Sequence, residues 1–246
     1  MCAKLWIALL VILAYATPAE AEEPRWDKYA GVLQRHIRQN TKDGISLAWL
    51  DYPALRQDPT FQQVVTTLEN FPIERLQGRQ EKLAFYINSY NIFAIKMVLD
   101  HWPTESIKDI GSWLTPVWKL DAGKINNKTT TLHKIEHEIL RPMGEPRIHM
   151  AIVCASLSCP DLRQEPFTAA RLDKQLQDQA SRFLNNHGKG VSSNGKSIRI
   201  SKIFDWFADD FSNSTAFIRR YHPDLPYDII IEGYLPYNWS LNGDNK

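Results

Sequence analysis

Residues Glu81 to Leu99 spell EKLAFYINSYNIFAIKMVL, which is the strongest helix pattern in the chain. We expect this helix to extend over residues 80–101 and to end at Trp102-Pro103, because proline cannot continue a helix. Only Ser89 and Lys96 define a polar side. The helix is therefore expected to present apolar side chains over most of its surface.

Two carboxamides, those of Asn88 and Asn91, fall on the most apolar face of this predicted helix. A buried polar group without a partner costs about 1–3 kcal/mol, so both amides must find partners. Two roles stay open. Either the amides hold neighbouring loop backbone, or they line a site and donate hydrogen bonds, for example to a developing oxyanion.

The rest of the chain predicts a mixture of helices and strands. Helices are expected over residues 25–40, 53–70, 132–141, 168–186 and 201–211, and strands over residues 45–52, 147–155 and 227–234. Asn194-Gly195 predicts a hairpin turn, and residues 103–130 are expected to be irregular. We therefore expect a single α+β (mixed α/β) globular domain over residues 22–246, with a central sheet and packed helices.

The first residues have the order of a secretory signal peptide. Lys4 precedes an apolar run from Leu5 to Ala16, and Ala19-Glu20-Ala21 is an A-x-A cleavage pattern. The run is shorter than the ~20 residues that a bilayer span needs. We expect a signal peptide over residues 1–21 and a periplasmic or secreted protein. The alternative is an uncleaved N-terminal anchor.

Composition limits the partners that the chain is expected to have. The formal net charge is +1, and the sequence has no basic block and no acidic tail, so no nucleic acid is expected. No later segment is apolar enough to cross a membrane, so no integral membrane segment is expected after signal cleavage. We expect no cofactor. The substrate is expected to be an unknown small molecule, a peptide or a component of the cell envelope.

Removal of the signal peptide leaves two cysteines, Cys154 and Cys159. The apolar run from Arg147 to Ala155 predicts a buried strand, which places Cys159 beyond its C-terminal end, where α/β folds commonly bind ligands. If Pro160 begins a helical turn, Cys159 lies at a helix N-terminus, which lowers a thiol pKa. Three states stay open for Cys159: a nucleophilic thiolate, a disulfide with Cys154, or an inert thiol.

A thiolate nucleophile needs a base within hydrogen-bond reach. His149 is close in sequence, but a strand from His149 to Ala155 would cover about 20 Å at ~3.3 Å per residue. This distance favours a structural role for His149. His137 is the preferred base, with Glu136 or Arg141 setting its charge state.

The run His133-Lys-Ile-Glu136-His137 has the H-x-x-E-H pattern of some zinc enzymes. Histidines four residues apart share one helix face, so His133 and His137 are candidates to grip one metal ion. No third ligand follows at a recognisable spacing. A solvated or structural helix face is therefore the favoured interpretation, and no metal is expected.

Seven short segments carry a resemblance to a known family. They are residues 85–91 (FYINSYN), 135–141 (IEHEILR), 149–154 (HMAIVC), 158–160 (SCP), 201–204 (SKIF), 210–211 (DF) and 237–242 (YNWSLN). In this order and spacing, the chain resembles the domain-of-unknown-function family 547 (DUF547) from about Val32 to Asn242. The resemblance implies an α/β domain that is often exported in bacteria and a site like that of a thiol hydrolase.

The patterned polar positions of the family fall on seven residues of this chain: Asn88, Asn91, Glu136, His137, Arg141, His149 and Cys159. His133 is not among them, which weakens the metal alternative. The leading hypothesis is a cysteine-dependent hydrolase or acyl-transferase acting on an amide, ester or thioester. The alternatives are a non-catalytic binding module with a structural or disulfide-bonded cysteine, and a metal-dependent hydrolase using His133 and His137.

Overall fold

The helix α4 (Arg79–Asp100) runs through the main hydrophobic core of a computed structural model that describes residues 23–245. Its bounds confirm the predicted helix. Almost every side chain from Leu83 to Val98 is buried, because the helix is apolar on nearly all sides. Ser89, predicted on the polar side, is buried and donates to the Phe85 carbonyl at 2.8 Å.

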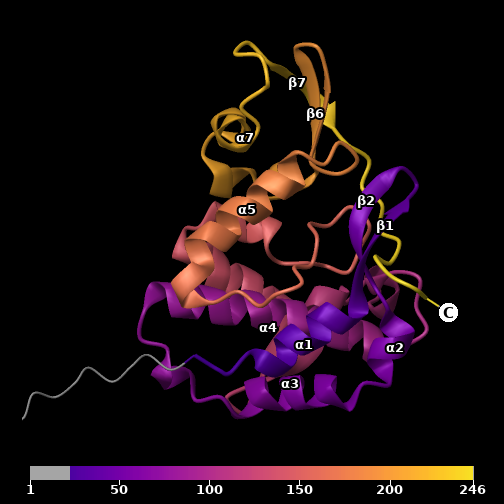
Figure 1. The fold of residues 1–246 in the computed structure, drawn as a ribbon, viewed down its shortest axis with the longest axis vertical. Coiled ribbons are helices and arrows are strands. Elements are labelled where there is room, and N and C mark those ends of the chain that lie inside the picture. The colour runs from indigo at the N-terminus through magenta and orange to yellow at the C-terminus, as the bar shows by residue number, and fades with distance from the viewer. Residues whose placement is uncertain (1–22, 246) are drawn as a thin grey trace, which may run out of the picture.

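Three N-terminal helices gather below α4 (Figure 1): α1 (Asp27–His36), α2 (Tyr52–Arg56) and α3 (Pro59–Asn70). The helix expected over residues 25–40 ends at His36, because Ile37–Lys42 (β1) pairs with Ile45–Leu50 (β2) in a hairpin. Asp43 and Gly44 both have positive φ in its turn, as a tight Asp-Gly hairpin requires. The strand predicted over residues 45–52 is confirmed by β2.

The strands form three small sheets, so the α+β class is confirmed but the expected central sheet is wrong. Beside the β1–β2 hairpin, β3 (Asp121–Ile125) pairs with β4 (Lys128–Thr131) inside the segment expected to be irregular. The third sheet holds the hairpin predicted at Asn194-Gly195, between β5 (Val191–Asn194) and β6 (Ser197–Ile200). β7 (Ile230–Tyr234) confirms the strand predicted over residues 227–234 and joins β6 in parallel; its Ile230 is 60% exposed.

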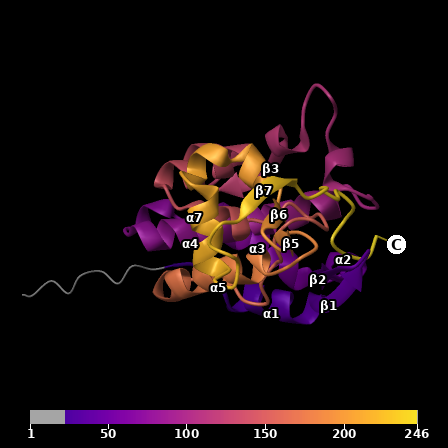
Figure 2. The ribbon, with the colours of Figure 1, turned by 90° about the horizontal axis from the view of Figure 1, so that it is seen from above.

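Two large hydrophobic clusters and a small third one, of Leu47, Trp49 and Leu157, form the interior. The largest cluster surrounds α4, and the second lies between the third sheet, α5 (Leu172–Leu184) and α7 (Ser214–Tyr221). The segment predicted as one helix over residues 201–211 is a short helix, α6 (Ile203–Trp206), followed by a 3₁₀ turn (Ala208–Phe211). Seen from above, α7 and the β1–β2 hairpin lie toward opposite sides of the molecule (Figure 2).

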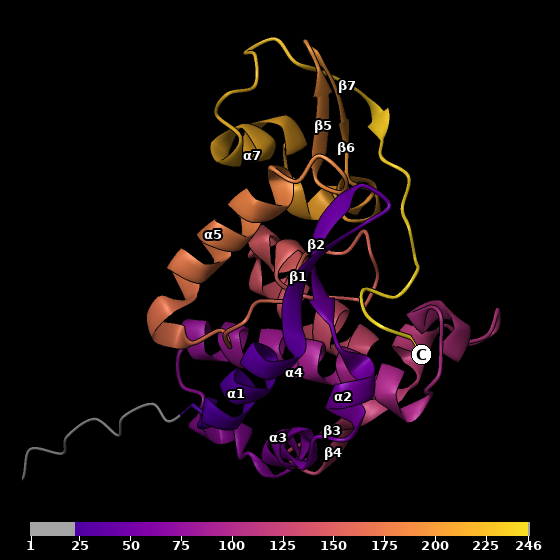
Figure 3. The same cartoon turned by 45° about the vertical axis from the view of Figure 1, so that its right-hand side comes forward.

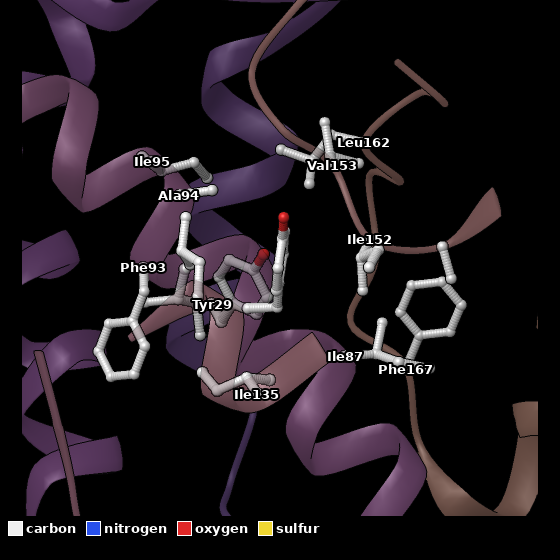
Figure 4. Close-up of a cluster of buried hydrophobic side chains, with 14 of the residues drawn as sticks. Tyr29, Ile87, Phe93, Ala94, Ile95, Ile135, Ile152, Val153, Leu162 and Phe167 are labelled. Carbon is white, nitrogen blue, oxygen red and sulfur yellow. The ribbon is translucent and has the colours of Figure 1, made fainter. Parts of the chain in front are cut away.

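The buried strand predicted over residues 147–155 is wrong. Residues Pro146–Met150 form a 3₁₀ helix, and an irregular segment from Ala151 to Thr168 then crosses α4. The segment is apolar because it packs against the helix: Ile152, Val153 and Leu162 face the α4 side chains in Figure 4. An apolar run of this length does not distinguish a strand from a buried irregular segment.

The C-terminal residues 237–244 lie between β2 and the segment that contains both cysteines. The amide of Leu50 donates to the Asn242 carbonyl at 3.0 Å, and the amide of Leu157 donates to the Ser240 carbonyl at 2.9 Å. Figure 3 shows this yellow segment descending from β7 beside the β1–β2 hairpin. These bonds bring Tyr237 and Trp239 to the cysteines.

The signal peptide predicted over residues 1–21 lies outside the described residues. Within residues 23–245, no helix combines the length and hydrophobicity that a membrane span requires.

Candidate functional site

A cavity of about 270 Å³ brings together residues from both large hydrophobic clusters. Most of its lining side chains are aromatic, titratable or sulfur-bearing. They are Tyr90, Trp118, Glu136, His137, His149, Ile152, Cys154, Cys159, Pro160, Ile203, Trp206, Phe207, Tyr237 and Trp239. Four of the seven predicted site residues, Glu136, His137, His149 and Cys159, therefore line one cavity.

The two asparagines of α4 lie elsewhere and bind backbone. The Asn88 amide donates to the Phe167 carbonyl at 2.8 Å and accepts from the Phe167 amide at 2.9 Å. Asn91 likewise donates to the Ala151 carbonyl at 3.0 Å and accepts from the Val153 amide at 2.8 Å. Both amides thus replace the pairing that the irregular segment lacks, and Asn91 fixes the residues just before Cys154.

His149 is held by a carboxylate that the sequence hypothesis did not include. Its Nε2 lies 2.7 Å from Asp210 Oδ2, and its ring stacks on Phe207 with centroids 4.1 Å apart. Burial lowers the pKa of His149 to about 4, although Asp210 opposes the shift. The ring is therefore neutral at pH 7, with the Nε2 proton donated to Asp210 and a lone pair on Nδ1.

Arg141 ties this pair to the second histidine. Its Nε and Nη2 donate to the two oxygens of Asp210 at 2.6 and 3.0 Å, a bidentate arrangement. Burial raises the pKa of Asp210, but the hydrogen bonds from Arg141 and His149 outweigh it and lower the pKa overall. Asp210 therefore stays ionised and orients His149.

His137 has the same Nε2–H tautomer, but its partner occupies the other ring nitrogen. Arg141 Nη1 lies 2.9 Å from His137 Nδ1 and can only donate, so Nδ1 accepts and Nε2 carries the proton. Burial lowers the pKa of His137, with His133 and Arg141 adding to the shift. The hydrogen bonds thus favour His137 as a donor and His149 as a base, the reverse of the predicted preference.

Glu136 is a buried carboxyl beside these histidines and comes from the π-helix Lys134–Leu140, where a short helix was predicted. Burial raises its pKa to about 7, while a hydrogen bond from Tyr90 and the charge of Arg141 oppose the rise. A carboxyl that titrates near neutral pH can give or take a proton at physiological pH.

Cys154 and Cys159 are joined by a disulfide, with Cα atoms 6.1 Å apart. In this state Cys159 has no thiolate to attack a substrate. Its sulfur accepts from the Cys154 amide at 3.0 Å and from the Tyr237 hydroxyl at 3.2 Å. No helix follows Pro160, so the predicted helix N-terminus at Cys159 is wrong.

An aromatic wall of four side chains, Trp118, Trp206, Tyr237 and Trp239, lines the cavity beside the disulfide. Trp239 contacts the other three, with ring centroids 5.6 Å from Trp118, 5.7 Å from Trp206 and 4.5 Å from Tyr237. Wide apolar rings with a few polar groups are typical of a ligand site.

The predicted histidine pair of the metal alternative stacks ring on ring, with His133 and His137 centroids 4.5 Å apart. Within residues 23–245, no three His, Cys, Asp or Glu side chains are arranged to hold a metal ion. Arg141 also places a positive charge against His137. The geometry therefore does not favour these histidines as metal ligands.

The family model described as "Protein of unknown function, DUF547" matches residues 73–184. This part of the chain belongs to the DUF547 family. The DUF547 segment contains all seven predicted site residues, so the resemblance is confirmed there, and its extension toward Val32 and Asn242 stays a prediction. No curated protein and no solved structure shows significant similarity to the chain.

The DUF547 segment does not contain the whole cavity. Asp210, which orients His149, and the three aromatic residues Trp206, Tyr237 and Trp239 come from residues beyond 184. The resemblance includes Asp210 and Tyr237 but implies a role for neither. The segments DF (210–211) and YNWSLN (237–242) were the signals that pointed to these residues.

Proposed function

We propose that this protein is an exported, thiol-dependent hydrolase or acyl-transferase whose site is the aromatic-lined cavity. One observation carries the proposal: His149, oriented by Asp210, lines the same cavity as Cys159. An imidazole held by a carboxylate is the base that activates a thiol or hydroxyl in many acyl-transfer sites.

The reaction requires the reduced protein. His149 Nδ1 takes the proton of the Cys159 thiol, and the sulfur attacks the carbonyl carbon of an amide, ester or thioester. His149 then returns the proton to the leaving group, and an acyl-cysteine remains. Water completes a hydrolysis, whereas a second nucleophile completes a transfer.

The other cavity residues have roles that suit this scheme. The Nε2 proton of His137 is available to an oxyanion, and Arg141 keeps that tautomer in place. Asn91 is a positioning residue, because it holds the backbone just before Cys154. Of the two roles left open for the asparagines, the hydrogen bonds to backbone support the one that holds a neighbouring segment.

Export to the periplasm or the medium is part of the proposal. The N-terminal pattern of Lys4, an apolar run and Ala19-Glu20-Ala21 supports it. So does the disulfide, because such bonds persist in oxidising compartments. The substrate is a small molecule, a peptide or an envelope component.

Intact mass spectrometry of the reduced protein tests the reaction. The protein is incubated with p-nitrophenyl esters, an aryl amide and an acyl thioester, and the acyl adduct is mapped. We expect an adduct on Cys159 that is lost in Cys159→Ala. His149→Gln should slow acylation by about 10²–10⁴-fold. Cys154→Ala is the matched control. It leaves Cys159 as a free thiol, so Cys159 should be acylated without reductant.

A non-catalytic binding module is the second candidate, favoured by the disulfide and the wall of four aromatic side chains. It predicts that no carbonyl compound leaves an adduct on either cysteine, reduced or oxidised. An adduct that forms equally in Cys159→Ala would contradict the acyl-transfer proposal.

A further inference from the structure

We propose that the Cys154–Cys159 disulfide is redox-active and accepts electrons from a dithiol, with Cys154 as the sulfur that is attacked and Cys159 as the leaving thiolate. The inference rests on the disulfide and its surroundings and holds whether or not the cavity catalyses acyl transfer.

Access distinguishes the two sulfurs. Both cysteines line the cavity, but Cys159 is 2% exposed, whereas Cys154 is only partly buried. A thiolate must approach a disulfide sulfur directly, so the more exposed Cys154 is the one it reaches.

Hydrogen bonding distinguishes them in the same direction. The Tyr237 hydroxyl lies 3.2 Å from Cys159 Sγ and 3.3 Å from Cys154 Sγ, so its proton can reach either sulfur and does not by itself distinguish them. The Cys154 amide donates to Cys159 Sγ at 3.0 Å, a closer contact than the 3.4 Å between Ser156 Oγ and Cys154 Sγ. The closer amide donor favours negative charge on Cys159 and makes it the better leaving group.

Opening the bond does not require the surrounding fold to open. The cysteines are five positions apart, so the disulfide closes only a small loop. Hydrogen bonds hold that loop independently: Leu157 donates to the Ser240 carbonyl at 2.9 Å and Ser158 to the Asn238 carbonyl at 3.2 Å. Asn91 holds its start. The reduced protein is therefore expected to keep the loop in place.

The exchange balances as two displacements. One thiolate of the dithiol attacks Cys154 Sγ, the bond to Cys159 breaks, and Cys159 leaves with the electron pair. The second thiol of the reductant then loses its proton and attacks the reductant's first sulfur, which is bonded to Cys154 in the mixed disulfide. Cys154 leaves and takes up the proton. The dithiol becomes a disulfide, and the protein gains two electrons. In the proposed enzyme, this step would supply the Cys159 thiolate.

Thiol-reactivity kinetics on variants that keep one of the two disulfide cysteines, in a Cys2→Ser background, test the assignment. In folded Cys159→Ser, the remaining Cys154 should react with 5,5′-dithiobis(2-nitrobenzoate) at least about tenfold faster than Cys159 in Cys154→Ser, because burial limits attack. Urea should remove the difference. Equal rates in the folded proteins, or a faster Cys159, would overturn the assignment.

The wild-type chain provides a second test that needs no serine variant. Native protein is treated with dithiothreitol or with reduced glutathione, quenched with acid and mapped by peptide mass. We expect two alkylatable thiols to appear with dithiothreitol without loss of the folded circular-dichroism spectrum, and glutathione to be trapped on Cys154. Tyr237→Phe should slow reduction several-fold while keeping the ring. Reduction only after unfolding, or glutathione on Cys159, would contradict the proposal.

Discussion

Two groups of polar side chains within the fold behave differently. The side-chain amides of Asn88 and Asn91 each bind one backbone carbonyl and one backbone N–H of the irregular segment that they face. The cavity group of Glu136, His137 and His149 instead consists of titratable side chains with displaced pKa values around an open volume. Neutral groups with fixed partners stabilise a fold, whereas buried ionisable groups beside a cavity retain capacity for chemistry.

The largest effect on stability is expected for Asn91→Ala. The substitution leaves the Ala151 carbonyl and the Val153 amide buried without partners, which should lower the free energy of unfolding by about 2–5 kcal/mol. Urea denaturation measures the change. A loss below about 1 kcal/mol would mean that the irregular segment does not depend on this side chain.

The free energy of unfolding should depend on pH through the carboxyl group of Glu136. Because the pKa of Glu136 is raised from 4.5 to about 7, its contribution to stability is complete below pH 4.5 and is lost as the pH rises through 7. The loss is roughly 3 kcal/mol at about 1.4 kcal/mol per unit. Glu136→Gln should remove this decline in urea denaturation between pH 4.5 and 8.

His149→Gln is the control, because His149 should make stability depend on pH in the opposite direction to Glu136. The pKa of His149 is lowered from 6.5 to about 4, so wild-type stability from this group is complete above pH 6.5 and is lost as the pH falls toward 4. The variant should be less sensitive to acid than the wild type. If both variants shift the profile in the same direction, the two pKa directions are not both right.

A smaller effect is expected from the disulfide. A loop this short contributes about 2 kcal/mol to stability in the chain-entropy account, so reduction should lower the free energy of unfolding by that amount. Cys154→Ala and Cys159→Ala should each lose the sensitivity to dithiothreitol. A much larger fall on reduction would show that the surrounding hydrogen bonds do not hold the loop.

The smallest effect is expected at the exposed side of α4. Lys96 pairs with Asp100 four residues later, and the two side chains are 24% and 49% exposed. Such pairs contribute about 0.3–0.5 kcal/mol, so Lys96→Ala should change the free energy of unfolding by less than about 0.5 kcal/mol. It is the matched control for Asn91→Ala on the same helix. A larger loss would show that the helix is generally intolerant of substitution.

Local patterns predicted the parts of the fold that depend on neighbouring residues. The apolar run of α4, the Asn-Gly turn between β5 and β6, and the Asn88 and Asn91 amides that needed partners all follow from spacing and composition. The predicted strand over residues 147–155 failed, because burial against α4 makes an irregular segment as apolar as a strand.

The sequence by itself determined the apolar helix, the α+β class and which side chains could take part in a reaction, because these depend on residue type and short-range periodicity. Only the tertiary structure decided which of them meet. It brought Asp210 to His149 and Tyr237 to Cys159 across 61 and 78 positions of chain, and it joined Cys154 to Cys159. Those contacts follow from the packing of distant segments, which no local pattern encodes.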